Sequence, residues 1–166
     1  GFDINEMRVN ELKNGIDTTK ELTTEELTLL NNINYVTELS KDNGCDIYIV
    51  TVPTPLADDK TPDLSPLINV SKTLGAVIKE EDIIIYESTV YPGVTEEICV
   101  PILEKGSGLK LNTDFYCGYS PERINPGDKT HRLKDIKKVT SGSCKKASDI
   151  IDDLYNQVIE AGMHKA

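Results

Sequence analysis

The sequence has no long apolar run, few basic residues and no closely spaced cysteine pair. No apolar stretch approaches the roughly 20 residues of a membrane-spanning helix, so we expect no membrane partner. The chain carries 28 acidic residues against 18 Lys and Arg, which gives a net charge of −10. Nucleic-acid backbones are bound by basic surfaces, so we expect no nucleic-acid partner either.

The four cysteines lack the spacing of a metal site. None forms a C-x-x-C pair and no histidine lies at ligand spacing, so no metal is expected. Cys45 and Cys117 lie at or within apolar, strand-like segments. This placement predicts reduced, buried thiols in a cytoplasmic protein.

Alternating strand and helix patterns fill the 166 residues, of which 38% are hydrophobic and 28% charged. This composition suits one globular domain with a core. Strands are expected at 46–52, 83–87, 115–119 and 136–140. Helices are expected at 5–14, 65–78, 94–104 and 147–158, and a further helix is expected to begin at the capping box of Thr23 and Glu26. Pro101 predicts a kink or an early end in the helix at 94–104. The alternation predicts an α/β, Rossmann-like, doubly wound and mostly parallel sheet with helices on both faces.

The first three residues, Gly1-Phe2-Asp3, read as the end of a strand. In dinucleotide-binding domains an acidic residue ends the second strand and holds the adenosine ribose, with a Gly-rich fingerprint about 20 residues earlier. A lone Asp at a strand end more often caps the following helix than binds ribose, so Asp3 needs support from other segments. If Asp3 is the ribose ligand, the domain lacks its first βα unit here.

Three loops follow expected strand ends, where ligands of parallel sheets bind. Val52-Pro53-Thr54-Pro55 is either a rigid turn or a ligand loop. The hydroxyls of Ser88 and Thr89 either cap the next helix or contact a ligand. The segment 120–128 carries Glu122 and Arg123 in a loop shaped by Pro and Gly, which favours ligand contact.

Basic residues gather late in the chain, which is otherwise acidic. A solvated face is the favoured interpretation, and a surface for an anionic ligand or a partner subunit is the alternative. The residues are Arg123, Lys129, Arg132, Lys134, Lys137, Lys138, Lys145 and Lys146.

Four segments together resemble the UDP-glucose/GDP-mannose dehydrogenase family: GFDINEMRVNELKNG, VTVPTPL, ESTVYPGVTEE and YSPERINPGD. They occur in family order along essentially the whole chain. The last segment, with HRL and KKVTSG downstream, is most similar to bacterial UDP-N-acetylglucosamine and UDP-N-acetylgalactosamine 6-dehydrogenases. The resemblance implies NAD as cofactor and a UDP-sugar as substrate. The sugar C6 alcohol becomes a uronic acid by two hydride transfers through a cysteine-bound thioester, in surface polysaccharide biosynthesis.

The resemblance also assigns roles to residues by their place in these segments. Cofactor binding falls to Asp3, Arg8, Val52, Pro53, Thr54, Ser88 and Thr89. Substrate binding falls to Glu122, Arg123 and Ile124. Glu122 is also implied as the group that activates water for thioester hydrolysis, and Thr89 as the hydroxyl that positions this water.

Several features of the family have no counterpart in these 166 residues. The Gly-rich loop, the central helix with its catalytic lysine and asparagine, and the UDP-binding domain with its nucleophilic cysteine are not found. Residues 1–166 are therefore expected to be a single truncated NAD-binding domain that is inactive alone and forms homo-oligomers, in part through an exposed sheet edge. UDP-glucose and UDP-N-acetylmannosamine are alternative substrates, and a non-catalytic α/β binding or structural module is the alternative of another class.

Overall fold

The computed structural model describes residues 1–30, 32–42, 44–123 and 133–166, in two compact units, Gly1–Asn43 and Gly44–Ala166. The first unit contains the helices α1 (Glu6–Lys13) and α2 (Thr24–Leu29). Asn5 caps α1 through its side-chain oxygen, and the expected capping box of Thr23 and Glu26 opens α2. Both helix starts are thus explained by local sequence.

Phe2 forms a parallel bridge with Val36 in the first unit. The Asp3 N–H donates to the Val36 oxygen at 3.1 Å, and the Val36 N–H donates to the Gly1 oxygen at 2.8 Å. The strand-like character expected for residues 1–3 is therefore present as a short parallel pairing.

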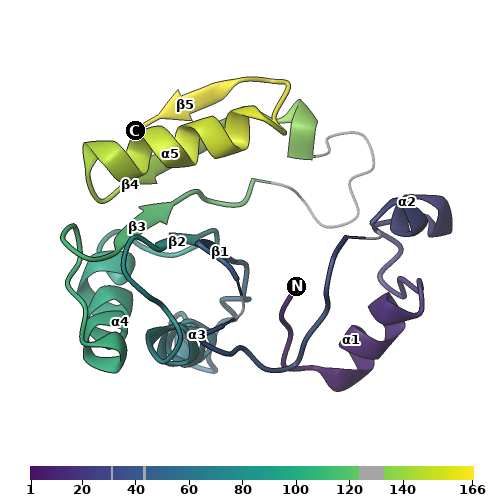
Figure 1. Cartoon of the computed structure of the whole chain (residues 1–166), viewed down its shortest axis with the longest axis horizontal. Helices are drawn as coiled ribbons and strands as arrows, with labels where there is room; N and C mark the ends of the chain where they lie inside the picture. The colour runs from purple at the N-terminus through teal and green to yellow at the C-terminus, as the bar shows by residue number, and fades with distance from the viewer. Residues whose placement is uncertain (31, 43, 124–132) are drawn as a thin grey trace. The chain divides into compact units, whose positions relative to one another are not determined.

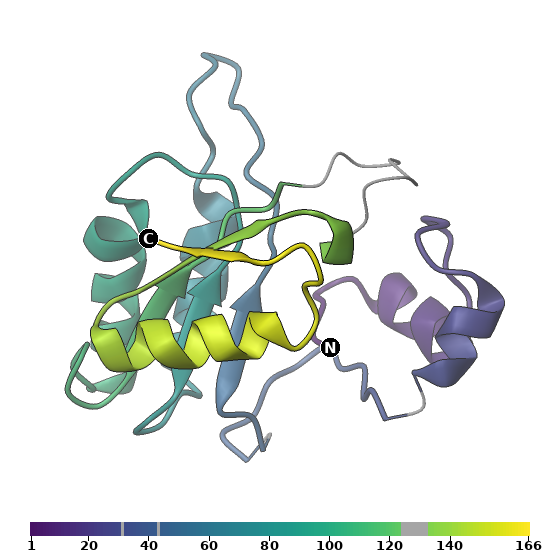
Figure 2. The same ribbon diagram turned by 90° about the horizontal axis from the view of Figure 1, so that it is seen from above.

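The second unit is built on a five-stranded sheet in the order β1-β2-β3-β4-β5 (Figures 1 and 2). Strands β1 (Ile47–Val50), β2 (Ile83–Tyr86) and β3 (Tyr116–Tyr119) are parallel and in register. Strand β4 (Lys138–Gly142) runs antiparallel to β3, and β5 (Met163–Lys165) runs parallel to β4. The three adjacent parallel strands confirm the sequence prediction, whereas β5 was not anticipated.

Helices cover both faces of this sheet (Figure 1). On one face α5 (Lys145–Asn156) packs Ile151 and Tyr155 against Ile83 and Ile85. On the other face lie α3 (Ser65–Gly75) and α4 (Val100–Ser107). Strand β2 is buried at every residue, as its continuous apolar sequence predicts, whereas Ile49 of the outer strand β1 is 48% exposed. The doubly wound α/β class is confirmed.

The early end expected at Pro101 is wrong, and the alternative of a kink there stays a prediction. The helix continues to Ser107, and the turn before the proline is the π-helix η1 (Thr95–Cys99), in which the Val100 N–H donates to the Thr95 oxygen. Proline has no N–H and its ring crowds the carbonyl four residues earlier. The wider π turn upstream accommodates this defect without ending the helix.

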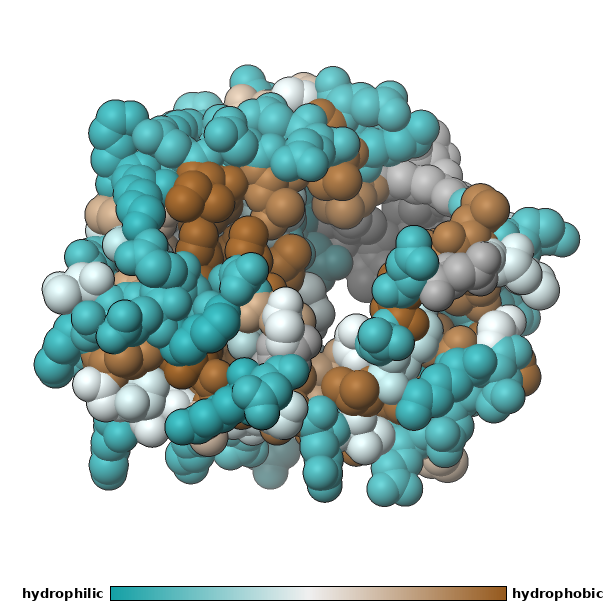
Figure 3. Space-filling model, in the orientation of Figure 1, coloured by the Kyte–Doolittle hydropathy of each residue, from teal (hydrophilic) through white to brown (hydrophobic). Residues whose placement is uncertain are grey.

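Helix α5 approaches the sheet closely at Gly118. A β-carbon there would lie 2.2 Å from Ile151 Cδ1 and 2.8 Å from the Ser141 oxygen. In Figure 3 apolar residues show in the seam beneath the hydrophilic outer surface of α5. Among the described residues, no helix is long and apolar enough to cross a membrane.

Candidate functional site

The loops after β1, β2 and β3 lie at one edge of the sheet, because these strands are parallel and their last residues are paired. The Ser88 hydroxyl, which is buried, donates to the Val52 oxygen at 2.5 Å. The Thr54 hydroxyl donates to the Thr89 oxygen at 2.9 Å. The side-chain hydroxyls of Ser88 and Thr54 thus fasten the first loop to the second.

The third loop is fastened to the second through the backbone. The Glu122 N–H donates to the Glu87 oxygen at 3.0 Å, and the Glu87 N–H donates to the Val50 oxygen at 2.8 Å. The Glu122 and Thr89 side chains are exposed. These two side chains are therefore accessible while the backbone beneath them is fixed.

These loops enclose a cavity of about 270 Å³ at the carboxyl ends of the strands. It unites six of the predicted site residues, together with Thr51 and Glu87. The six are Val52, Pro53, Thr54, Ser88, Thr89 and Glu122.

A second cavity of about 160 Å³ shares Glu87 and Glu122 with the first. Its other lining residues are Arg123, Leu133, Ile136 and Lys138. The Arg123 guanidinium donates to the Lys137 oxygen at 3.0 Å, which anchors this side chain at the cavity wall. Ile124, predicted to contact substrate, lies outside the described residues.

Between the two cavities lies a buried charge network that the sequence analysis missed. Lys138 Nζ lies 3.0 Å from Glu87 Oε1, and the two side chains are 4% and 15% exposed. The Tyr155 hydroxyl donates to the same Glu87 oxygen. Burial and the Glu87 carboxylate raise the pKa of Tyr155 above its usual range, so Tyr155 stays a neutral donor.

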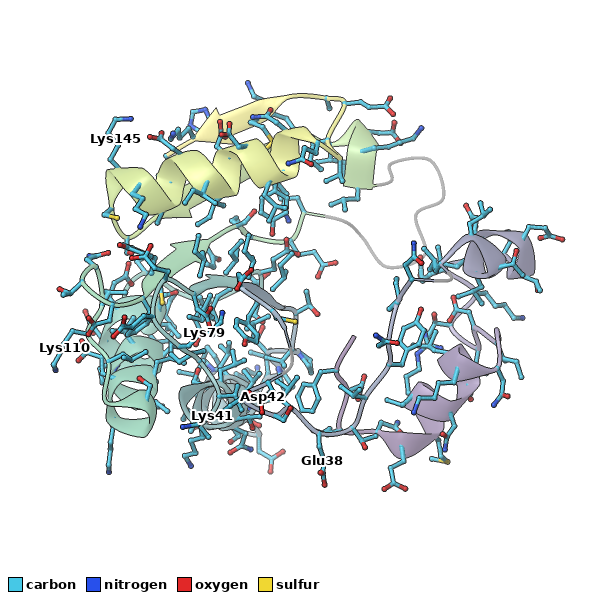
Figure 4. The ribbon with its side chains drawn as sticks, viewed as in Figure 1. Glu38, Lys41, Asp42, Lys79, Lys110 and Lys145 are labelled. Atoms are coloured by element: carbon cyan, nitrogen blue, oxygen red, sulfur yellow. The ribbon has the colours of Figure 1, made fainter. Side chains whose placement is uncertain are left out.

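Lys138 departs from the solvated face that was favoured for the basic residues, because its side chain is 4% exposed. Its ammonium is enclosed because β4 places its side chain under α5, where it lies 5.2 Å from the centre of the Tyr155 ring. The sequence held one signal of this burial, since Lys138 is a charged residue inside the strand expected at 136–140. Lys134 and Lys145 do lie at the surface, paired with Glu160 and Asp149 respectively, and Figure 4 shows Lys145 at the outer start of α5.

The first unit holds the remaining two predicted residues. The Asp3 carboxylate accepts a hydrogen bond from the Asn5 N–H at 2.8 Å, so it stabilises the turn that precedes α1. Arg8 Nη2 lies 2.8 Å from Asp17 Oδ1, and its Nη1 atom is buried without a hydrogen bond. Burial alone would raise the pKa of Asp17, but hydrogen bonds from Thr19, Leu22 and Arg8 outweigh it and hold that pKa well below its usual range.

The cysteines divide by location. Cys117 is buried in β3, and burial raises the pKa of its thiol. Cys45 is exposed just before β1, so the expectation that it is buried is wrong. Cys99 is also buried, and Cys144 is half-buried. A thiol with a raised pKa is a poor nucleophile, which agrees with a packing role for Cys117.

Comparisons with known proteins agree with this geometry. The chain is 55% identical over 166 residues to the UDP-N-acetyl-D-glucosamine 6-dehydrogenase of Salmonella typhi, covering 100% of this chain and 39% of that protein. It is 51% identical to Protein CapL of Staphylococcus aureus over 166 residues, again 100% of this chain and 39% of that protein. The chain thus spans well under half the length of these relatives.

A solved structure shares the fold. The UDP-D-ManNAc dehydrogenase from Pyrococcus horikoshii superposes with a TM-score of 0.87 at 26% identity, covering 100% of this chain and 40% of that one. The model of the UDP-glucose/GDP-mannose dehydrogenase family, NAD binding domain, matches residues 1–159. The chain therefore belongs to the UDP-glucose/GDP-mannose dehydrogenase family, as part of its NAD-binding domain.

Proposed function

We propose that the full-length protein carrying this chain is an NAD-dependent dehydrogenase that oxidises the C6 alcohol of a UDP-N-acetylhexosamine to the uronic acid. The observation that supports it most directly is the cavity at the strand ends, where Thr89 and Glu122 are exposed over a fastened loop framework. The identity to UDP-N-acetyl-D-glucosamine 6-dehydrogenase favours this substrate class over UDP-glucose and UDP-N-acetylmannosamine. Surface polysaccharide biosynthesis is the proposed context.

The residues present fit one end of a dinucleotide. Val52, Pro53 and Thr54 form one wall of the larger cavity, and Ser88 and Thr89 form another. When bound there, NAD supplies the hydride acceptor. Asp3 and Arg8 are proposed to hold the adenosine end. The Arg8 guanidinium remains charged, because its Nη2 atom lies 2.8 Å from Asp17 Oδ1 and its Nη1 atom lies 3.5 Å from Glu11 Oε2.

Glu122 and Thr89 are proposed as the catalytic residues of this chain. Both line the larger cavity, and a carboxylate is a suitable base for a water that attacks a thioester. The Thr89 hydroxyl would orient this water. Arg123 and Ile124 are proposed to lie along the sugar nucleotide. Glu122 then acts in the last, hydrolytic step rather than in hydride transfer.

Three further proposals concern the whole protein. The family match spans both units, which supports residues 1–166 as parts of one NAD-binding domain. We propose a homo-oligomer, because β1 and β5 are the outermost strands of the sheet in the described part of the second unit, and edge strands favour association. The cytoplasm, where NAD and UDP-sugars are available, is the proposed location.

The test is NADH formation by the purified full-length protein with a panel of UDP-sugars. UDP-N-acetylglucosamine or UDP-N-acetylgalactosamine should give two NADH per uronic acid, identified by mass spectrometry. Preference for UDP-glucose or UDP-N-acetylmannosamine would reassign the substrate. No NADH with any of the four sugars would reject the dehydrogenase and favour a non-catalytic binding module.

A further inference from the structure

The Glu87 carboxylate uses only one of its two oxygens within the chain. Lys138 Nζ lies 3.0 Å from Oε1, and the Tyr155 hydroxyl donates to the same oxygen. Among the described residues, no hydrogen bond or ion pair reaches Oε2. The side chain is partly exposed, and Glu87 lines both cavities at the strand ends. Oε2 is therefore the oxygen that remains for a ligand.

The carboxylate of Glu87 is held in place from both its backbone and its side chain. Its N–H donates to the Val50 oxygen, and its own backbone oxygen accepts the Glu122 N–H. Lys138 and Tyr155 fix the side chain through Oε1, from β4 and α5. An acceptor that is already fixed loses little conformational freedom when a ligand binds, so its hydrogen bond contributes more to affinity than that of a mobile surface carboxylate.

The charges around the smaller cavity indicate which kind of group Glu87 can bind. The lining holds two carboxylates, Glu87 and Glu122, and two cations, Arg123 and Lys138. The Arg123 guanidinium donates to the Lys137 oxygen rather than to Glu87. With the formal charges balanced, the lining favours neither an anionic diphosphate nor a further cation. An ionised carboxylate only accepts hydrogen bonds, so a neutral O–H or N–H group is its best partner.

We propose that Glu87 binds the sugar of the substrate, with Oε2 accepting a hydrogen bond from a hydroxyl or from the acetamido N–H. Lys138 and Tyr155 are positioning residues that fix this carboxylate. The inference rests on the proposed function, since it takes the ligand to be a UDP-N-acetylhexosamine. The sugar is favoured over NAD because Lys138, which holds Oε1, lines the smaller cavity with Arg123, a residue proposed to lie along the sugar nucleotide.

The experiment measures Kd values of the full-length protein by isothermal titration calorimetry. UDP-N-acetylglucosamine and UDP are each titrated with NADH present, so that no turnover occurs, and NAD is titrated alone. UDP lacks the sugar, so the ratio of the first two Kd values isolates the sugar contacts.

Glu87→Gln keeps the size of the side chain. Its amide oxygen can still accept from Lys138 and Tyr155, which leaves an NH2 group in place of Oε2. The matched control is Glu160→Gln, because Glu160 pairs with Lys134 at the surface and lines neither cavity.

Glu87→Gln should raise the Kd for UDP-N-acetylglucosamine about 10- to 150-fold, the contribution of a hydrogen bond to a charged group. The Kd values for UDP and NAD should stay at those of the wild type. Tyr155→Phe removes one of the two donors to Oε1 and should raise the same Kd by a smaller factor, again without changing the Kd for UDP. Glu160→Gln should match the wild type with all three ligands.

A folded Glu87→Gln protein with the wild-type Kd for UDP-N-acetylglucosamine overturns the proposal. An equal rise for UDP-N-acetylglucosamine and UDP also overturns it, since Glu87 would then have a structural role alone, and a rise confined to NAD would move Glu87 to the cofactor. If Glu87→Gln does not fold, the double variant with Lys138→Met, which removes both charges, is measured against the same outcomes. Wild-type protein that binds neither UDP-N-acetylglucosamine nor NAD would instead reject the proposed function, and this inference with it.

Discussion

Replacing Glu122 with Gln in the full-length protein should separate its chemical role from a structural one. Gln keeps the size of the side chain and removes the base. The loop is tied by the backbone N–H of residue 122 to the Glu87 oxygen, and the side chain is exposed. The substitution therefore leaves this tie in place, and the Tm should stay within about 1–2 °C, as for most exposed substitutions.

The catalytic effect of Glu122→Gln should be large. A general base contributes about 100- to 10,000-fold to its step, which corresponds to about 3–5.5 kcal/mol of activation free energy. The first hydride transfer precedes thioester hydrolysis, so a burst of NADH should remain in stopped-flow measurements while steady-state kcat falls. A covalent sugar–enzyme adduct should accumulate, visible in the intact-protein mass spectrum.

The control is Glu80→Gln, which makes the same change at an exposed residue preceding β2, at the opposite edge of the sheet. It should leave the burst, kcat and mass spectrum unchanged. The reasoning fails if Glu122→Gln lowers the Tm and the substrate affinity together and no adduct forms. Glu122 would then be an anchor of its loop rather than a base.

Three further substitutions test pairing and packing, one within the first unit and two within the second. Asp17→Asn should cost about 1.5–3 kcal/mol at pH 7, the worth of a hydrogen bond to a charged partner such as Arg8. The lowered pKa of Asp17 stabilises the folded state above the ordinary pKa of about 4, and this stability is lost as the pH falls. The difference in the free energy of unfolding between Asp17→Asn and the wild type, measured with urea, should therefore shrink below that pH. A difference that does not change with pH would contradict the ion pair. Gly118→Ala should lower the free energy of unfolding by about 1–3 kcal/mol because its methyl group meets Ile151, and an unchanged urea midpoint would show that α5 can move. Ser71→Ala removes the 2.7 Å partner of a buried tyrosine hydroxyl and should cost about 1–3 kcal/mol in the same assay, whereas a neutral result would mean that water replaces the serine.

The sequence predicted the parallel part of the sheet and most of the larger cavity. The run Ile83–Tyr86 is apolar at every position, as is typical of a strand in a sheet that is covered on both faces. Residues that directly follow such strands, including Thr54, Thr89 and Glu122, then meet at one edge by topology alone. Periodicity and strand order were therefore enough to assemble these residues.

What the sequence did not show depends on side-chain direction and on distant pairing. Lys138 was counted with the solvated basic residues, and only the pairing of β4 with β3 and the packing of α5 bring it to Glu87. Glu87 and Tyr155 are 68 residues apart, so no local pattern links them. Strand β5 is three residues long and owes its conformation to pairing with β4 rather than to its own sequence.

The hydroxyls of Ser88 and Thr54 affect how mutational data on this site should be interpreted. Each donates its proton to a backbone oxygen of the neighbouring loop, so each is already committed before a cofactor arrives. A substitution that removes either hydroxyl releases one loop from the other and shifts Thr89 with it. Weaker NAD binding in such a variant would therefore combine the loss of this loop-to-loop hydrogen bond with any loss of a cofactor contact. An exchange of Ser88 for Thr, or of Thr54 for Ser, keeps the donor and should separate the two effects.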